Sequence, residues 1–204
     1  MDTLVDDVGS FPLSHYVDRQ LFNRAHVLAR EAFIKGKDIR KDDFLLNSFY
    51  RVIIDSFRKK CQAGLDVVNY PQHYDMHRQF MDTVHEAMDK GTYVVDEKQA
   101  IMPEVHVIND EAKRICEETG KKVLLRVCVT GPMELYLKEV GTTAYKDVLL
   151  MFAETVKRFA KNAVLNSKYV KTKVVSLDEP SFGFQDVSAD KDTILDVLEK
   201  AFDF

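Results

Sequence analysis

The stretch Lys122–Pro132, KVLLRVCVTGP, decides the fold class of this chain. Residues 123–129 are apolar apart from Arg126, and the Thr-Gly-Pro turn that follows stops the run. A strand that is apolar on both faces is typical of a parallel sheet covered by helices on both sides. We therefore predict a buried parallel strand that ends at the Thr130-Gly131-Pro132 turn.

The rest of the chain alternates short β-prone runs with amphipathic stretches of helical period. The expected strands cover residues 4–12, 65–70, 92–102, 122–129 and 172–177. The expected helices cover residues 16–34, 42–63, 74–88, 107–118, 144–165 and 189–201, the last after a glycine-bearing loop. This order favours right-handed βαβ crossovers, so we expect an α/β fold with about five parallel strands.

Composition narrows the class of protein further. The chain has 204 residues, 46% of them hydrophobic and 30% charged, which is enough for one globular domain over residues 1–204. A net charge of −4 without a basic patch argues against a nucleic-acid partner. The sequence shows no apolar run of membrane-spanning length and no signal peptide, so we expect no membrane partner and a cytoplasmic location. The odd number of cysteines, Cys61, Cys116 and Cys128, favours reduced thiols over a disulfide framework.

Polar residues follow the expected strands, at the edge where α/β folds place their chemistry. Gly9-Ser10 offers backbone N–H groups and a hydroxyl to a small carboxylate, although an ordinary turn would look the same. Asp178-Glu179 offers carboxylates to an ammonium group, or alternatively caps a helix or forms surface ion pairs. His73 and His77, four residues apart, would share a helix face and could bind zinc, but solvated polar side chains are the commoner outcome.

Four motifs follow one another along the chain. They are Val8-Gly9-Ser10-Phe11-Pro12, Gly64-Leu65-Asp66-Val67 leading to Asp75-Met76 and Phe80, Val129-Thr130-Gly131-Pro132, and Leu177-Asp178-Glu179-Pro180. In order and spacing they resemble the catalytic barrel of cobalamin-independent methionine synthase, and especially its shorter archaeal-type relatives. The resemblance spans roughly residues 4–185. It implies a TIM (β/α)8-type barrel of the uroporphyrinogen decarboxylase and methionine synthase superfamily. It also implies transfer of a methyl group from methyltetrahydrofolate, or from a methylcorrinoid, to homocysteine to give methionine.

The resemblance assigns roles to particular residues of the expected substrate site. Gly9 and Ser10 would hold the carboxylate of homocysteine, and Asp178 would bind its ammonium group. Gln72 stands nearest to a glutamate that the family usually has after its second strand. Together with Thr130, these residues are expected to face one space at the carboxyl ends of the strands.

The zinc that activates the homocysteine thiol in this family is bound by a His-x-Cys pair, a Glu and a further Cys after the Asp-Glu-Pro strand. Within residues 1–204 we find no such set, so we expect an incomplete barrel that a second chain, a C-terminal segment or a corrinoid protein would complement. On this view the isolated chain would not methylate homocysteine. Two alternatives stay open: a non-catalytic, partner-binding half-barrel, and a uroporphyrinogen decarboxylase-like enzyme that would need arginines at its strand ends.

Overall fold

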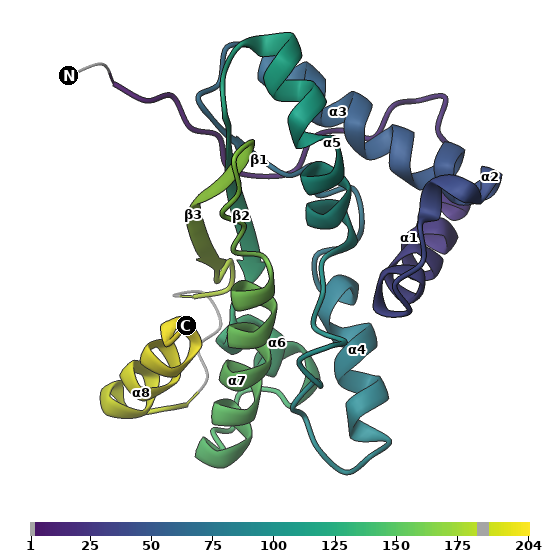
Figure 1. Ribbon diagram of the computed structural model, residues 1–204. Helices are drawn as coiled ribbons and strands as arrows, with labels where there is room; N and C mark the ends of the chain where they lie inside the picture. The colour runs from purple at the N-terminus through teal and green to yellow at the C-terminus, as the bar shows by residue number, and fades with distance from the viewer. Residues whose placement is uncertain (1–2, 183–187) are drawn as a thin grey trace. The chain divides into compact units, whose positions relative to one another are not determined.

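The computed structural model describes residues 3–182 and 188–204 and shows an α/β protein (Figure 1). Its three-stranded sheet has the order β1-β2-β3, with bounds Val67–Asn69 for β1, Val123–Thr130 for β2 and Val170–Asp178 for β3. Strand β1 pairs with β2 in parallel, with Val67 opposite Leu124. The α/β class and the parallel sheet predicted from the sequence are therefore confirmed.

The described residues fall into two compact units. The first unit comprises residues 1–74, 101–128 and 163–175, and the second comprises residues 75–100, 129–162 and 176–204. The beginnings of β2 and β3 belong to the first unit and their ends to the second. The expectation of a single domain stays a prediction.

The helices of the first unit are α1 (Arg19–Ile34), α2 (Asp43–Leu45), α3 (Arg51–Gln62) and α5 (Pro103–Thr119). Helix α2, a π-helical turn over residues 46–50 and α3 follow one another without a break, as expected for one long helix. Asp42 caps this helix by accepting the N–H of Leu45 at 3.0 Å. It ends before Gly64, whose φ of +89° is a conformation that side-chain-bearing residues rarely adopt.

An aromatic cluster forms the core of the first unit. Phe22 of α1 lies 5.8 Å, between ring centroids, from Phe49 in the π-helical turn. The imidazole of His26 stacks on Tyr74 at 3.9 Å and meets Phe49 edge to face at 5.6 Å. The buried face of α1 therefore agrees only in part with the apolar stripe predicted for residues 16–34. Its alanines are buried, whereas Leu21 and Leu28 are exposed and Phe22 and His26 make the aromatic contacts.

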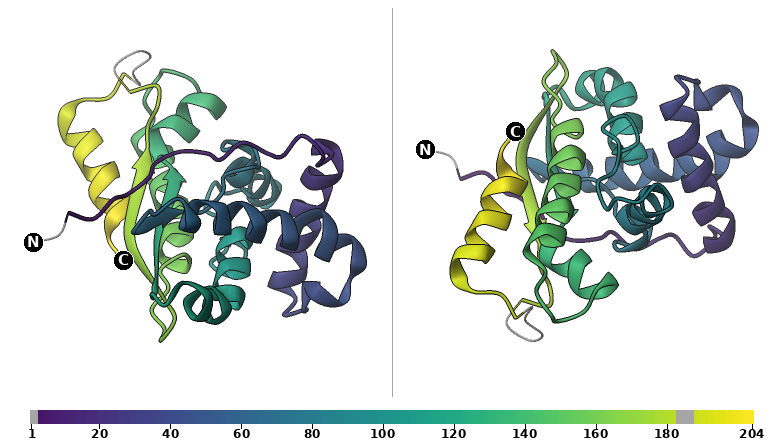
Figure 2. Two further views of the ribbon diagram at one scale, coloured as in Figure 1. Left: turned by 90° about the horizontal axis from the view of Figure 1, so that it is seen from above. Right: turned by 90° about the horizontal axis from the view of Figure 1, so that it is seen from below.

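The helices of the second unit are α4 (Arg78–Met88), α6 (Pro132–Glu139), α7 (Lys146–Asn162) and α8 (Lys191–Phe202). Helices α7 and α8 lie side by side in the views of Figures 1 and 2. Phe152 of α7 packs edge to face against Tyr136 of α6, with ring centroids 5.8 Å apart. Helix α6 was not expected; Pro132 occupies its first position, where a missing N–H costs nothing.

The expectation of a first strand over residues 4–12 is wrong. This segment makes a single parallel bridge, between Asp6 and Val67 of β1, and forms no strand. The carbonyl of Val5 accepts the N–H of Val67 at 3.0 Å, but the N–H of Asn69 donates to the Asp7 side chain at 2.7 Å. A side-chain carboxylate thus takes the position of the next backbone acceptor, which ends the pairing.

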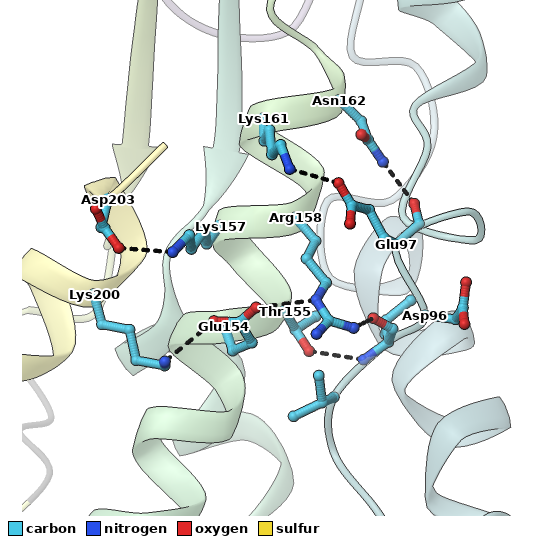
Figure 3. Close-up of polar contacts among 12 residues, drawn as sticks. Asp96, Glu97, Glu154, Thr155, Lys157, Arg158, Lys161, Asn162, Lys200 and Asp203 are labelled. Carbon is cyan, nitrogen blue, oxygen red and sulfur yellow. Dashed lines mark hydrogen bonds and ion pairs between the residues drawn. The ribbon is translucent and has the colours of Figure 1, made fainter.

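The expectation of a strand over residues 92–102 is also wrong, because side chains of α7 satisfy its backbone (Figure 3). The hydroxyl of Thr155 donates to the carbonyl of Tyr93 at 2.7 Å and accepts the N–H of Val95 at 3.0 Å. Arg158 donates to the carbonyl of Val95 at 2.8 Å, and Asn162 donates to that of Ala100 at 2.9 Å. Backbone groups that are bonded in this way have no need of a neighbouring strand.

The described residues therefore form three strands where about five were expected, and they do not show a closed barrel. Helices α1, α4 and α7 are shorter than predicted, whereas α5 begins earlier, at Pro103. The expected glycine-bearing loop before α8 falls on residues 183–187, which lie outside the described residues. None of the described helices has the length and apolar character that crossing a bilayer requires.

We predict that Thr155→Val lowers the free energy of unfolding by about 2–4 kcal/mol. The substitution keeps the volume but leaves the N–H of Val95 and the carbonyl of Tyr93 without their partner, and Thr155 is fully buried. Lys161→Ala serves as the control, since its ion pair with Glu97 is about half exposed on both sides and should contribute little to stability. Urea denaturation of both variants measures the difference, and equal effects would contradict this role of Thr155.

Candidate functional site

In the first unit, polar side chains gather at the end of β1 around the carboxylate of Asp7. Its Oδ1 accepts the N–H of Asn69 at 2.7 Å, and its Oδ2 lies 2.7 Å from Nζ of Lys60. Lys60 is nearly buried and also donates to the carbonyl of Asn69 at 3.0 Å. The half-buried carboxylate of Asp7 thus pairs with the buried ammonium group of Lys60, which a buried charge requires.

The side chain of Asn69 connects the predicted residues Gly9 and Gln72. Its Nδ2 donates to the carbonyl of Gly9 at 3.0 Å and to Oε1 of Gln72 at 3.2 Å. Gly9 has a φ of +103°, so a side chain at this position would strain the turn. Ser10 is exposed next to this fixed turn, which leaves its hydroxyl accessible to a ligand.

One atom of this group is a buried acceptor. Oδ1 of Asn69 has no hydrogen-bond partner among the described residues, although Asn69 is fully buried. Such an acceptor is uncommon in native proteins, because leaving it unpaired costs about 1–3 kcal/mol. It is therefore suited to accept an N–H or O–H group of a bound molecule.

His73 and His77 do not form the helix-borne metal pair considered from the sequence. Helix α4 begins only at Arg78, so neither histidine lies on it. In the first unit, Nε2 of His73 lies 2.8 Å from Oγ of Ser56, and burial lowers the pKa of His73 to about 4. His73 is therefore a neutral, hydrogen-bonded core residue at neutral pH.

In the second unit, the Thr-Gly-Pro and Asp-Glu-Pro motifs contact each other through Glu179. Its carboxylate accepts the N–H groups of Met133, at 3.0 Å, and of Glu134, at 2.6 Å. These are the first free donors of α6, because Pro132 has none. Glu179 therefore caps α6 from the end of β3.

This contact explains why residue 131 is a glycine. A Cβ atom there would lie 2.2 Å from the carboxylate carbon of Glu179. The φ of Gly131 is −71°, so the requirement is space and not backbone conformation. The N–H of Gly131 also donates to the carbonyl of Asp178 at 2.9 Å, which extends the pairing of β2 and β3.

A histidine and two glutamates complete this end of the second unit. Nε2 of His77 lies 2.7 Å from Oε1 of Glu134, whose Oε2 accepts the N–H of Ser181 at 3.2 Å. Burial raises the pKa of Glu179 to about 7, despite its backbone donors. Burial also acts to raise the pKa of Glu134, but the hydrogen bonds from Ser181 and His77 outweigh it and hold that pKa below its usual value. Neighbouring carboxyl groups of which one has a raised and the other a lowered pKa are typical of acid–base sites.

Two predicted substrate residues lie in this unit. Asp178 is half-buried at the end of β3, and Ser176 Oγ donates to its Oδ1 at 3.4 Å. The hydroxyl of Thr130 donates to the carbonyl of Met76 at 2.9 Å, which fixes the segment before α4. Since Gly9, Ser10 and Gln72 belong to the first unit, the expectation of one shared space stays a prediction.

Sequence reasoning missed Asp7, Lys60 and Asn69 in the first unit and Glu134 in the second. Asp7 and Asn69 lie close to predicted residues along the chain, and Lys60 is a charged residue within an apolar helix pattern. The signal for Glu134 was its place two residues after a proline that can begin a helix. The sequence analysis considered His77 as a zinc ligand together with His73, whereas in the structure it contacts Glu134.

The described residues do not fit the zinc that the resemblance implies. They contain no cluster of three or more His, Cys, Asp and Glu side chains that could hold a metal ion. Cys128 is fully buried, and burial raises the pKa of the Cys61 thiol to about 11, whereas a zinc ligand must be a thiolate. We therefore derive no step through zinc from these residues.

Glu179 should make stability depend on pH. Because its pKa is about 7 in the folded chain and about 4.5 when unfolded, the folded state binds the proton more tightly. This stabilisation is complete below about pH 4.5 and is lost as the pH rises through about 7, a change of about 3 kcal/mol. Glu179→Gln lacks this titration, so the stability of the wild type relative to the variant should fall as the pH rises through about 7.

The measurement is the free energy of unfolding of both proteins from about pH 5 to pH 8. Asp196→Asn, which changes an exposed carboxylate of the same unit, is the control. A constant difference between wild type and Glu179→Gln across this range would contradict the raised pKa.

Comparisons with known proteins add no further constraint on this chain. No family model, curated protein or solved structure matches it. What supports a function is therefore the chemistry of the Asn69 and Glu179 groups and the resemblance of the motifs that contain them.

Proposed function

We propose that this chain binds homocysteine and takes part in transferring a methyl group to its sulfur, as the methionine synthases that its motifs resemble do. The observation that carries the proposal is the pairing of these motifs. Asn69 binds the carbonyl of Gly9 in the first unit, and Glu179 fills the space above Gly131 in the second. The third and fourth motifs thus contact each other in the second unit. In the first unit, the first motif is bound by Asn69, which follows the second motif at the end of β1.

The groups offered to a ligand suit an amino acid. Gly9 and Ser10 provide a fixed turn with a hydroxyl for a carboxylate, and the half-buried carboxylate of Asp178 is suited to an ammonium group. Gln72 cannot supply the charge of the family's usual glutamate, and both ends of its side-chain amide are bonded to Asn69 and Tyr70. We therefore assign ammonium recognition to Asp178.

We further propose that the sheet belongs to a TIM-type barrel. Consecutive strands are neighbours in the order β1-β2-β3, and the segment around Asp6 bridges β1 on its other side. Doubly wound sheets reverse their order at a switch point, and the described strands contain no such reversal. A second chain, a further segment or a corrinoid protein is the proposed partner, with a methylfolate or a methylcorrinoid as donor.

The decarboxylase-like alternative is less well supported. It would need arginines free to bind several carboxylates at the strand ends. Arg126, the one arginine within the described strands, donates through Nε to both carboxylate oxygens of Asp6 at 3.0 Å. Asp6 thus already neutralises it.

We predict that Asp178→Asn weakens homocysteine binding by about 1.5–3 kcal/mol, roughly 10–150-fold in Kd. The amide keeps the shape of the side chain but loses the charge that attracts the ammonium group. Isothermal calorimetry compares homocysteine with the thiol acid that lacks only its amino group. The analogue should bind both proteins equally weakly.

Asp196→Asn, on an exposed carboxylate of α8, is the matched control and should bind homocysteine like the wild type. Undiminished binding of homocysteine by Asp178→Asn would contradict the assignment of Asp178. Absence of any binding by the wild type would contradict the proposed function itself.

A further inference from the structure

A pocket of about 380 Å³ lies within the first unit, between the beginning of α1 and the long helix. Its volume falls in the range of pockets that bind small molecules. One wall is formed by α3 and by the π-helical turn over residues 46–50 that precedes it, and Ser48, Val52 and Ser56 line the pocket from there. Because π-helical turns are rare and are often found at functional sites, this wall is a candidate binding surface.

The lining of the pocket suits an uncharged molecule with a short apolar chain. Phe22 is fully buried and Val52 is half-buried, and both contribute apolar surface. The charged side chains that line the pocket are two cations and two carboxylates, Arg51, Lys59, Asp18 and Asp55. Since these charges cancel, the pocket has no net preference for an ion of either sign.

The hydroxyl of Ser56 is paired with a histidine that lies behind it in the core. Oγ of Ser56 lies 2.8 Å from Nε2 of His73, and both residues are buried. Phe22 meets the ring of His73 edge to face, with ring centroids 5.7 Å apart. Only Ser56 of the two lines the pocket. A serine at a pocket, within hydrogen-bond distance of a fixed imidazole, is the arrangement that activates a nucleophile.

The imidazole of His73 is neutral at physiological pH. Burial lowers the pKa of His73 to about 4, so its lone pair is free above about pH 5. Charged side chains of three helices also act on the ring. Glu104 of α5 acts to raise its pKa, whereas Arg19 of α1 and Lys60 of α3 act to lower it.

The position of the ring proton follows from the backbone of Phe11. Nδ1 of His73 is buried without a well-aligned partner among the described residues, but the backbone of Phe11 lies close enough to act on the ring and to raise its pKa. A backbone group has this effect when it accepts a ring proton. The proton therefore belongs on Nδ1, which leaves Nε2 to accept the hydroxyl of Ser56.

We infer that Ser56 is a nucleophile that takes up the acyl group of a short-chain carboxylic ester bound in this pocket, with His73 as its base. The O–H bond of Ser56 breaks, its proton moves to Nε2, and Oγ forms a bond to the ester carbonyl carbon. The bond from that carbon to the alcohol oxygen then breaks, and the proton on Nε2 passes to the leaving oxygen. A water molecule that loses its proton to the same nitrogen later releases the acid and restores the serine. This inference does not rest on the proposed function.

Lys59 supplies positive charge near the reacting carbon. It follows Ser56 by three residues on α3, so both lie on the same face of the helix, and both line the pocket. Negative charge develops on the carbonyl oxygen while Oγ attacks, and a nearby cation stabilises it. Lys59→Gln should therefore slow acylation of Ser56 without moving the acyl group to another residue.

The first test reads the ring of His73 in the wild-type chain without any ligand. Nitrogen-15 NMR reports which ring nitrogen is protonated and at which pH the second one becomes so. We expect the proton on Nδ1 and a neutral ring down to about pH 5. A proton on Nε2 would overturn the inference, because Nε2 could then not accept the hydroxyl proton.

The second test uses p-nitrophenyl butyrate as the probe. We expect a burst of nitrophenolate of one equivalent per chain, and a butyryl group on Ser56 in peptide mass spectrometry. The rate constant of the burst should stay constant between about pH 6 and pH 8, because His73 is neutral throughout this range. Acylation of a lysine would instead accelerate roughly tenfold per pH unit, since its amino group has a pKa of about 10.4.

Variants separate the two roles. Ser56→Ala should lose the burst, and His73→Gln should slow it by at least about 100-fold, the usual contribution of a general base. His106→Gln is the matched control and should leave the burst unchanged, because His106 is another histidine of the same unit whose pKa is lowered by burial. Circular dichroism checks that each variant is folded.

Three results would overturn the inference: no burst from the wild type, a butyryl group on Lys59 instead of Ser56, or an equally fast burst from folded Ser56→Ala. The tautomer and the pH profile are measured on the wild type, so they remain decisive if replacement of the buried His73 unfolds the chain.

Discussion

The arrangement of the second unit depends on where the carboxylate of Glu179 lies. It accepts the first free N–H groups of α6 and occupies the space that a side chain at residue 131 would need. The end of β3, the turn after β2 and the first turn of α6 are therefore tied together by one side chain. Because α6 carries Glu134, this tie also determines where His77 finds its partner.

The carboxylate of Asp7 has the corresponding structural role in the first unit. It binds the N–H of Asn69 and the ammonium of Lys60, so the N-terminal segment is fixed beside β1 by a side chain instead of a strand ladder. In both units a carboxylate takes over backbone hydrogen bonds at a strand end. The Gly9-Ser10 turn is thus fixed without strand pairing, and the turn after β2 is fixed by Glu179 in addition to the bond from Gly131 to Asp178.

Periodicity predicted the elements whose stability comes from burying an apolar face. The long helix from Asp42 to Gly64 and the apolar strand before Thr130 are examples, and both form as expected. Periodicity failed where side chains bind backbone groups. Nothing in the apolar pattern of residues 92–102 reveals that Thr155, some sixty positions later, would take up their hydrogen bonds.

The candidate-site residues divide in the same way, into those that the sequence pattern reveals and those that it does not. Motif order singled out Gly9, Gln72, Thr130 and Asp178. The structure places Thr130 and Asp178 at the ends of β2 and β3 and Gln72 shortly after β1, whereas Gly9 lies in a segment that forms no strand. It could not identify Asn69 or Glu134, because their roles depend on contacts between residues distant in sequence. The contact of Glu134 with His77 spans 57 positions.

The motifs can also be understood by what each residue is needed for. Gly131 is required by space, since Glu179 leaves no room for a Cβ atom, whereas Gly9 is required by its positive φ. Glu179 is bound by backbone donors and is therefore occupied in capping α6. Of the Asp-Glu pair, the proposed function therefore assigns the ammonium group of the ligand to Asp178, whose Oδ1 also accepts a hydrogen bond from Ser176. The same strand end thus carries a structural carboxylate, that of Glu179, and the carboxylate that we propose to bind the substrate, that of Asp178.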